Sequence, residues 1–155
     1  MPGPLAQGPR VALRPAREDD LALVRDLRAG DRTGEMLVIT LRTDDRPIGI
    51  IQYRVDEPSA GWVTIDHLAL EKKSRRWGLG QDAVRLFEEE AASSRGVAHF
   101  RTTVDIQQGL LLYLWLRLGY RPAEYTYDAS GSEALAMIRE AGSLAIVPRP
   151  RYHSP

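Results

Sequence analysis

Three strand-like segments that follow one another closely constrain the fold of this chain most. Residues 36–41, 48–55 and 62–70 are rich in β-branched and other apolar residues, and the short turn-forming segments 43–47 and 56–61 separate them. Connections this short can join only antiparallel neighbours, because a parallel pair needs a crossover of about a dozen residues or more. The sequence therefore predicts a three-stranded antiparallel meander.

The rest of the chain alternates between helical and strand patterns. Apolar residues at helical spacing predict three helices, over residues 18–27, 78–94 and 107–118. Strand patterns occur four more times, over residues 11–15, 98–104, 120–127 and 134–138. The order β-α-β-β-β-α-β-α-β-β has no internal repeat and no long linker. It indicates one α/β domain with a mixed, mostly antiparallel central sheet flanked by helices.

We expect this domain to span residues 11–141, between a flexible tail at residues 1–10 and a proline-rich tail at residues 142–155. The helix over residues 107–118 is apolar nearly all round, so we expect it to be buried on most sides or to lie at an interface, which allows a homodimer. The three consecutive glutamates of the preceding helix, Glu88, Glu89 and Glu90, are expected to form a solvated face.

Composition excludes several classes of function. The 21 Lys and Arg residues balance 21 Asp and Glu residues, so no broad positive field attracts nucleic acid or an anionic membrane. The chain has no Cys, and its three His residues lack metal-ligand spacing, so we expect no metal site. The first ten residues lack the apolar segment of a signal peptide, which makes the cytoplasm the expected location.

A basic, glycine-containing stretch between the strand at 62–70 and the helix at 78–94 is the clearest candidate for a binding site. It reads Arg75-Arg76-Trp77-Gly78-Leu79-Gly80. Glycines let the backbone approach a ligand closely, and the free N–H groups of a helix start favour a phosphate. The alternatives are a solvated basic turn and a dinucleotide fingerprint, but that fingerprint directly follows its strand, whereas Glu71 to Trp77 intervene here.

This stretch, together with a second block, resembles the GCN5-related N-acetyltransferases (GNAT). Arg75-x-x-Gly78-x-Gly80 after the strand resembles the family's Q/R-x-x-G-x-G/A signature. The second block, from Val104-x-x-x-Gln108 to Leu118-Gly119-Tyr120, resembles V-x-x-x-N through L-Y-x-x-L-G-F. The element order from about residue 11 to 139 agrees with a GNAT-type sheet.

The resemblance implies that the chain binds acetyl-CoA as co-substrate. The stretch from Arg75 to Gly80, including Arg76, Trp77 and Leu79, would hold the pyrophosphate. The pantetheine arm would pair with Leu68, Ala69 and Leu70, in a splay between that strand and the next. A backbone N–H of Leu70 or a neighbour would polarise the thioester carbonyl. Gln108 stands where the family has Asn, and Trp115 stands where it usually has a tyrosine that acts as acid.

Two residues of the central strand are candidates for the general base. Asp66 shares a strand face with Thr64 and acts as base directly or through a water, unless it only pairs with an arginine. His67 faces the other way unless a bulge reorients it, and an imidazole titrates near neutral pH. Trp115 can donate a hydrogen bond but cannot transfer a proton, and a thiolate with an ordinary pKa of about 8.5 leaves acceptably without an acid.

The sequence thus favours an acyl-CoA-dependent N-acetyltransferase in which a primary amine attacks the thioester directly within a ternary complex. The acceptor would be a small-molecule or peptide amine. Because the connection at 30–35 looks shorter than the family's second-helix region, we expect an open acceptor cleft. The alternatives are a non-catalytic acyl-CoA-binding regulatory module and an interaction protein that uses the apolar helix at 107–118.

Overall fold

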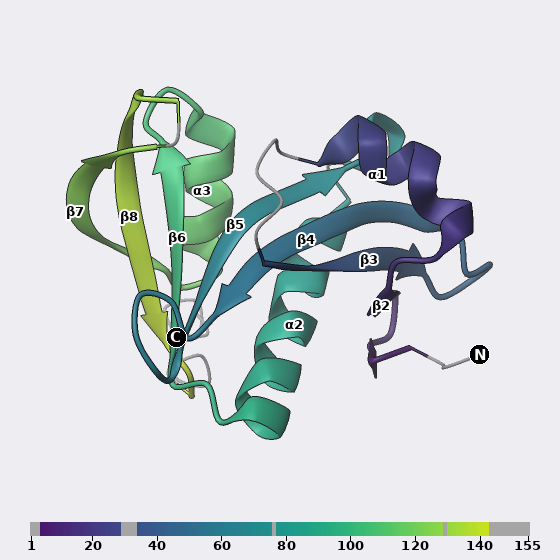
Figure 1. The fold of residues 1–155 in the computed structure, drawn as a ribbon. Coiled ribbons are helices and arrows are strands. Elements are labelled where there is room, and N and C mark those ends of the chain that lie inside the picture. The colour runs from purple at the N-terminus through teal and green to yellow at the C-terminus, as the bar shows by residue number, and fades with distance from the viewer. Residues whose placement is uncertain (1–3, 29–33, 76, 129, 143–155) are drawn as a thin grey trace, which may run out of the picture.

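The structure is a computed structural model, and it describes residues 4–28, 34–75, 77–128 and 130–142. One mixed sheet of eight strands, with α1, α2 and α3 against it, makes up this part of the chain (Figure 1). The strands are β1 (Ala6–Gln7), β2 (Val11–Pro15), β3 (Glu35–Leu41), β4 (Pro47–Val55), β5 (Trp62–Leu70), β6 (His99–Asp105), β7 (Arg121–Tyr127) and β8 (Glu133–Glu140). The α-helices are α1 (Leu21–Leu27), α2 (Leu79–Arg95) and α3 (Gly109–Arg117), and 3-10 turns lie at Glu18–Asp20 and Lys72–Ser74.

The sheet has the order β1-β2-β3-β4-β5-β6-β8-β7, and β5 with β6 is its parallel pair. The predicted meander is present as the antiparallel run β3-β4-β5. The pair β5–β6 is parallel because α2 carries the chain back across the sheet between them, as a crossover connection requires. The predicted fold class, a mixed and mostly antiparallel sheet flanked by helices, is therefore confirmed.

The helices α1 and α2 cover opposite faces of the sheet. Val38 of β3 and Ile50 of β4 pack with Val24 of α1. Their strand neighbours point the other way, because successive side chains alternate between faces. These neighbours, among them Ile39 and Ile51, form the main core with α2 and α3.

The segment before Val11, which we expected to be a tail, contributes the edge strand β1. Ala6 and Gln7 pair with Leu13 and Ala12 of β2, and the N–H of Leu5 donates to the carbonyl oxygen of Leu13 at 2.8 Å. Two residues are too short to carry a recognisable strand pattern. The proline-rich segment beyond residue 142 and most of the connection at 30–35, including Gly30, lie outside the described residues.

The expectation that Glu88 belongs to a solvated face of its helix is wrong. Glu88 is 3% exposed and accepts hydrogen bonds from the Tyr120 hydroxyl at 2.6 Å and from Arg139 Nη1 at 2.5 Å. Its position, four residues after the buried Val84 and three before the buried Ala91, belongs to the inward stripe of α2. Burial raises the pKa of Glu88 against the opposing effects of Arg139 and Tyr120.

The helix α3 is less enclosed than its composition suggested. Trp115 is 2% exposed, but Leu110 is 84% and Tyr113 57% exposed, so one face of the helix is open in the described chain. No helix among the described residues combines the length and apolar character needed to cross a membrane.

Candidate active site

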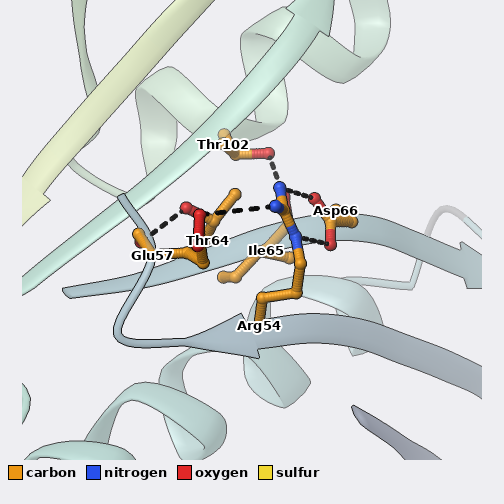
Figure 2. Close-up of polar contacts among 6 residues, drawn as sticks. All are labelled: Arg54, Glu57, Thr64, Ile65, Asp66 and Thr102. Atoms are coloured by element: carbon orange, nitrogen blue, oxygen red, sulfur yellow. Dashed lines mark hydrogen bonds and ion pairs between the residues drawn. The ribbon is translucent and has the colours of Figure 1, made fainter. Parts of the chain in front are cut away.

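The strands β5 and β6 separate halfway along their length. Four parallel pairs join them, from Trp62 with His99 to Ile65 with Thr102. Beyond this point neither strand pairs with the other, and the ribbons diverge (Figure 1). The buried hydroxyl of Thr102 donates to the carbonyl oxygen of Ile65 at 3.0 Å, which gives a partner to the carbonyl where the ladder ends (Figure 2).

The open edge of β5 presents backbone groups of Leu68 and Leu70. The N–H of Glu71 donates to the carbonyl oxygen of Ile48 at 2.8 Å, so Glu71 directs its N–H toward β4. Because these directions alternate along a strand, the N–H groups of Leu68 and Leu70 point the opposite way, into the opening. The intervening Ala69 lies opposite Ile50 and directs its groups toward β4.

The helix α2 begins beside this open edge. Gly78 caps it with a φ of +78°, a left-handed conformation that a residue with a Cβ adopts only with strain. A Cβ placed on Gly80 would lie 3.5 Å from Leu70 Cδ1, which is ordinary van der Waals contact. The protein's own packing therefore demands glycine at 78 but not at 80.

The remaining residues of the predicted loop differ in their surroundings. Arg75 donates from Nε to the carbonyl oxygen of Leu70 at 3.0 Å, which ties the loop to the end of β5. Trp77 is 67% exposed, and Leu79 is buried in the core. Arg76 lies outside the described residues.

A β-bulge reorients the centre of β5. Tyr53 pairs with Ile65 and the adjacent Gln52 pairs with His67, which leaves Asp66 as the extra residue. His67 consequently lies on the α1 face of the sheet, where its Nε2 is 2.7 Å from the carbonyl oxygen of Leu27 at the end of α1. In a regular strand it would have faced the opposite side, together with Ile65.

This contact assigns the protons of the His67 ring. A carbonyl oxygen only accepts, so Nε2 carries the hydrogen and Nδ1 is the lone-pair nitrogen of the neutral ring. Regular alternation of side chains along β5 would place Asp66 and His67 on different faces of the sheet. The sequence allowed for a bulge that reorients His67, and the structure has this bulge.

Asp66 is held in an ion pair. Arg54 Nε lies 2.8 Å from its Oδ2 and Arg54 Nη2 lies 2.9 Å from its Oδ1, so both carboxylate oxygens accept from one guanidinium (Figure 2). Arg54 Nη1 is also 3.6 Å from Glu57 Oε2, and the Thr64 hydroxyl donates to the Glu57 carbonyl oxygen at 2.7 Å. Asp66 thus has the arginine partner that the sequence left open as an alternative to a catalytic role.

The two residues at the family's Asn and Tyr positions lie at opposite extremes of burial. Gln108 is exposed and caps α3, where its carbonyl oxygen accepts from the N–H groups of Leu111 and Leu112. Trp115 is buried, and its ring meets the Tyr120 ring edge-on with centroids 4.8 Å apart. Trp115 therefore packs in the core and directs its ring at Tyr120.

Sequence reasoning missed three polar residues around the opening. Thr102 closes the ladder, Arg54 holds Asp66, and Arg10 Nη1 donates to the carbonyl oxygen of Trp77 at 2.9 Å. The pairing of Arg54 with Asp66 could have been predicted, because Arg54 lies in the neighbouring strand of the predicted meander. The contacts of Arg10 could not have been predicted, since its partners are 67 or more residues away in the sequence. In the described part of the chain no three His, Asp or Glu side chains gather as a metal site would need.

Comparisons with solved structures find the same fold. A spermidine N-acetyltransferase from Vibrio cholerae, in complex with CoA and spermine, gives a TM-score of 0.74 at 8% identity, covering 88% of this chain and 98% of that chain. A putative acetyltransferase from Sphaerobacter thermophilus gives 0.63 at 15% identity, with 87% and 96% covered. A ribosomal-protein-S5-alanine acetyltransferase from Vibrio fischeri gives 0.68 at 7% identity, with 89% and 97% covered. At such identities the likeness shows the fold alone.

A comparison with curated protein sequences finds no match. The model of the acetyltransferase (GNAT) family matches residues 6–120, most of the chain. This match begins at β1 and ends at Tyr120, so it includes the opening between β5 and β6 and the start of α2. The chain therefore belongs to the GNAT acetyltransferase family.

Proposed function

We propose that this protein is an N-acetyltransferase that moves the acetyl group of acetyl-CoA to a primary amine, by direct attack within a ternary complex. One observation carries the proposal: the edge of β5 at Leu68 and Leu70 has no strand partner, and the start of α2 at the left-handed Gly78 lies beside it. An unpaired strand edge suits the amide-bearing pantetheine arm, and a helix N-terminus suits the diphosphate.

The loop fits the diphosphate in two ways. Gly78 leaves the backbone accessible where a side chain would be strained, and Gly80 leaves space that the core of the protein does not need. The N–H groups of the first turn of α2 have no partner within the helix, so they are suited to phosphate oxygens. Arg75 and Arg76 add positive charge, Arg75 from its place at the end of β5.

The N–H groups of Leu68 and Leu70 are the donors for the thioester carbonyl. When the amine attacks, the new C–N bond places negative charge on this oxygen, and a fixed backbone N–H stabilises that charge. The C–S bond then breaks, and CoA leaves as a thiolate. No protonated acid is needed at that step, because a thiol has an ordinary pKa of about 8.5. This agrees with the tryptophan at position 115.

We assign His67 as the general base. Its Nε2–H is held by the Leu27 carbonyl oxygen, so Nδ1 is left to accept a proton from the ammonium of the acceptor, directly or through a water, which leaves the neutral amine that attacks. Asp66 is less suited, because both of its oxygens already accept from Arg54. Asp66 is instead assigned a positioning role, because it is the extra residue of the bulge that places His67 on the α1 face and its carboxylate is tied to Arg54.

The acceptor is assigned as an amine that approaches from the α1 face, where His67 lies. The solved relatives of this fold are described as acting on polyamines and on a ribosomal-protein alanine. A first panel of acceptors should therefore contain spermidine, spermine and peptides with a free N-terminal alanine.

The test combines calorimetry with a CoA-release assay over this panel of amines. We expect CoA and acetyl-CoA to bind and at least one amine to release CoA above the rate of hydrolysis. The buried Trp115 at the usual tyrosine position favours a second candidate, a non-catalytic acyl-CoA-binding module. Binding without turnover on any amine would support that module. Absence of CoA binding would overturn both candidates.

A further inference from the structure

The side chain of Arg10 joins the turn before β2 to the first turn of α2. Its Nη1 donates to the carbonyl oxygen of Trp77 at 2.9 Å, and its Nε donates to Asp82 Oδ2 at 2.7 Å. The turn itself is fixed, because the N–H of Arg42 donates to the carbonyl oxygen of Arg10 at 2.9 Å. Arg10 therefore reaches the proposed phosphate loop from a firmly held backbone.

The bond to Trp77 fixes the direction of a backbone N–H. The carbonyl of Trp77 and the N–H of Gly78 belong to one peptide unit, and in a trans peptide these groups point in opposite directions. With the carbonyl held by Arg10, the N–H of Gly78 points away from Arg10. A Cβ at Gly78 would lie 3.0 Å from Arg10 Nη2, so the guanidinium also occupies the space that a side chain would use.

The bond to Asp82 neutralises a charge in an unfavourable place. Asp82 is the acidic residue in the first turn of α2, where a bound diphosphate would experience its repulsion. The Arg10 guanidinium compensates this charge at 2.7 Å. The same side chain thus orients one donor of the loop and removes a charge that opposes an anion.

We propose that Arg10 is a positioning residue for coenzyme A, which holds the Gly78 N–H toward the diphosphate and offsets Asp82 without contacting the ligand. The inference rests on the proposed function, because the loop must bind CoA for Arg10 to matter. It adds a residue outside the loop, from the segment that the sequence analysis expected to be a tail.

The test measures the CoA dissociation constant and the melting temperature of the wild type, Arg10→Met, Asp82→Asn and the double variant. Both single variants lose the same ion pair, so a merely structural role predicts the same weakening of CoA binding in each. We expect Arg10→Met to weaken CoA binding about tenfold. Asp82→Asn should leave it unchanged or strengthen it, and Asp82→Asn added to Arg10→Met should recover part of the loss.

The matched control is Arg95→Met, which removes a similarly exposed arginine–carboxylate pair, with Glu35, at the other end of α2. It should not change CoA affinity. Arg10→Met with wild-type affinity, or Asp82→Asn as damaging as Arg10→Met, would overturn the role of Arg10. A wild-type protein that does not bind CoA would overturn the proposed function instead, so the two failures are distinguishable.

Discussion

The two halves of β5 share one strand but differ in their partners. In the closed half, residues 62–65, β5 pairs with β6 on one side and, through residues 63–65, with β4 on the other. In the open half, residues 66–70, β5 pairs with β4 alone through residues 67–70, and Asp66 is the extra residue of the bulge. Next to the first half, Arg139, opposite Phe100 of β6, joins Glu88 and Tyr120 in a buried cluster. The open half itself carries His67, and the start of α2 lies beside it. The difference teaches that β6 pairs with the backbone of β5 in the closed half, whereas in the open half the N–H groups of Leu68 and Leu70 have no strand partner and remain available to a ligand.

A substitution in the buried cluster beside the closed half of β5 should give the largest effect, and it should change the stability but not the binding of CoA. Glu88→Ala leaves the guanidinium of Arg139 buried without its carboxylate, so we expect a loss of about 3–5 kcal/mol in the free energy of unfolding. Urea denaturation measures this loss, and CoA titration of the folded fraction should give the wild-type dissociation constant. A variant as stable as the wild type, or a stable variant that no longer binds CoA, would contradict the proposed difference between the two halves.

The counterpart beside the open half is Gly78→Glu at the start of α2, which should weaken the binding of CoA. A carboxylate at this position opposes a diphosphate, and we expect CoA affinity to fall about 100-fold or more. The strain of a side chain at a φ of +78° should lower stability by only about 1–2 kcal/mol. Calorimetry and denaturation together check both values. Unchanged affinity would move the diphosphate away from this loop.

The two candidates for the base sharpen the comparison within the open half. His67→Gln should reduce kcat/KM about 100-fold at neutral pH and remove the acid limb of the pH–rate profile, with CoA affinity unchanged. Asp66→Asn, as the matched variant one residue away, should cause a smaller loss with the limb retained. The reverse ranking would make Asp66 the base and His67 a packing residue.

A substitution at Thr102, which bonds to β5 at the boundary between the halves, should have the smallest effect on stability and CoA affinity. Thr102→Val keeps the side-chain shape but removes the donor to the Ile65 carbonyl oxygen, a buried bond. We expect the free energy of unfolding to fall by about 1–2 kcal/mol and CoA affinity to change less than the stability does. Denaturation and CoA titration check these expectations. Full stability in this variant would show that the end of the ladder needs no side-chain partner.

Local patterns were sufficient to predict β5 and the element order from β2 to β8. The limits of β5 were predicted correctly because its apolar and β-branched residues form one run that begins directly after the turn at 56–61. The loop was predicted because its glycines and arginines are contiguous. The role of Trp115 could only be raised as a question, since burial of its ring depends on contact with Tyr120.

The features that sequence reasoning missed depend on contacts between distant segments. A bulge at Asp66 leaves no mark in the alternation of β5 and is visible only in its pairing with β4. The position of Glu88 in the inward stripe of α2 could have been read from helical spacing, but its partners Tyr120 and Arg139 come from elsewhere in the chain. Arg10 meets the start of α2 across a sequence separation of 67 or more residues, so no local pattern indicates the contact.

The divergence of β5 from β6 also bears on aggregation. Unpaired backbone groups at the rim of a sheet invite strands of other molecules and so promote self-association. Here the N–H groups of Leu68 and Leu70 face β6 rather than the rim of the sheet, so a strand of another molecule reaches them less readily than it reaches the rim. The fold can thus expose main-chain donors to a thin, flexible ligand while limiting the hazard that such donors usually bring.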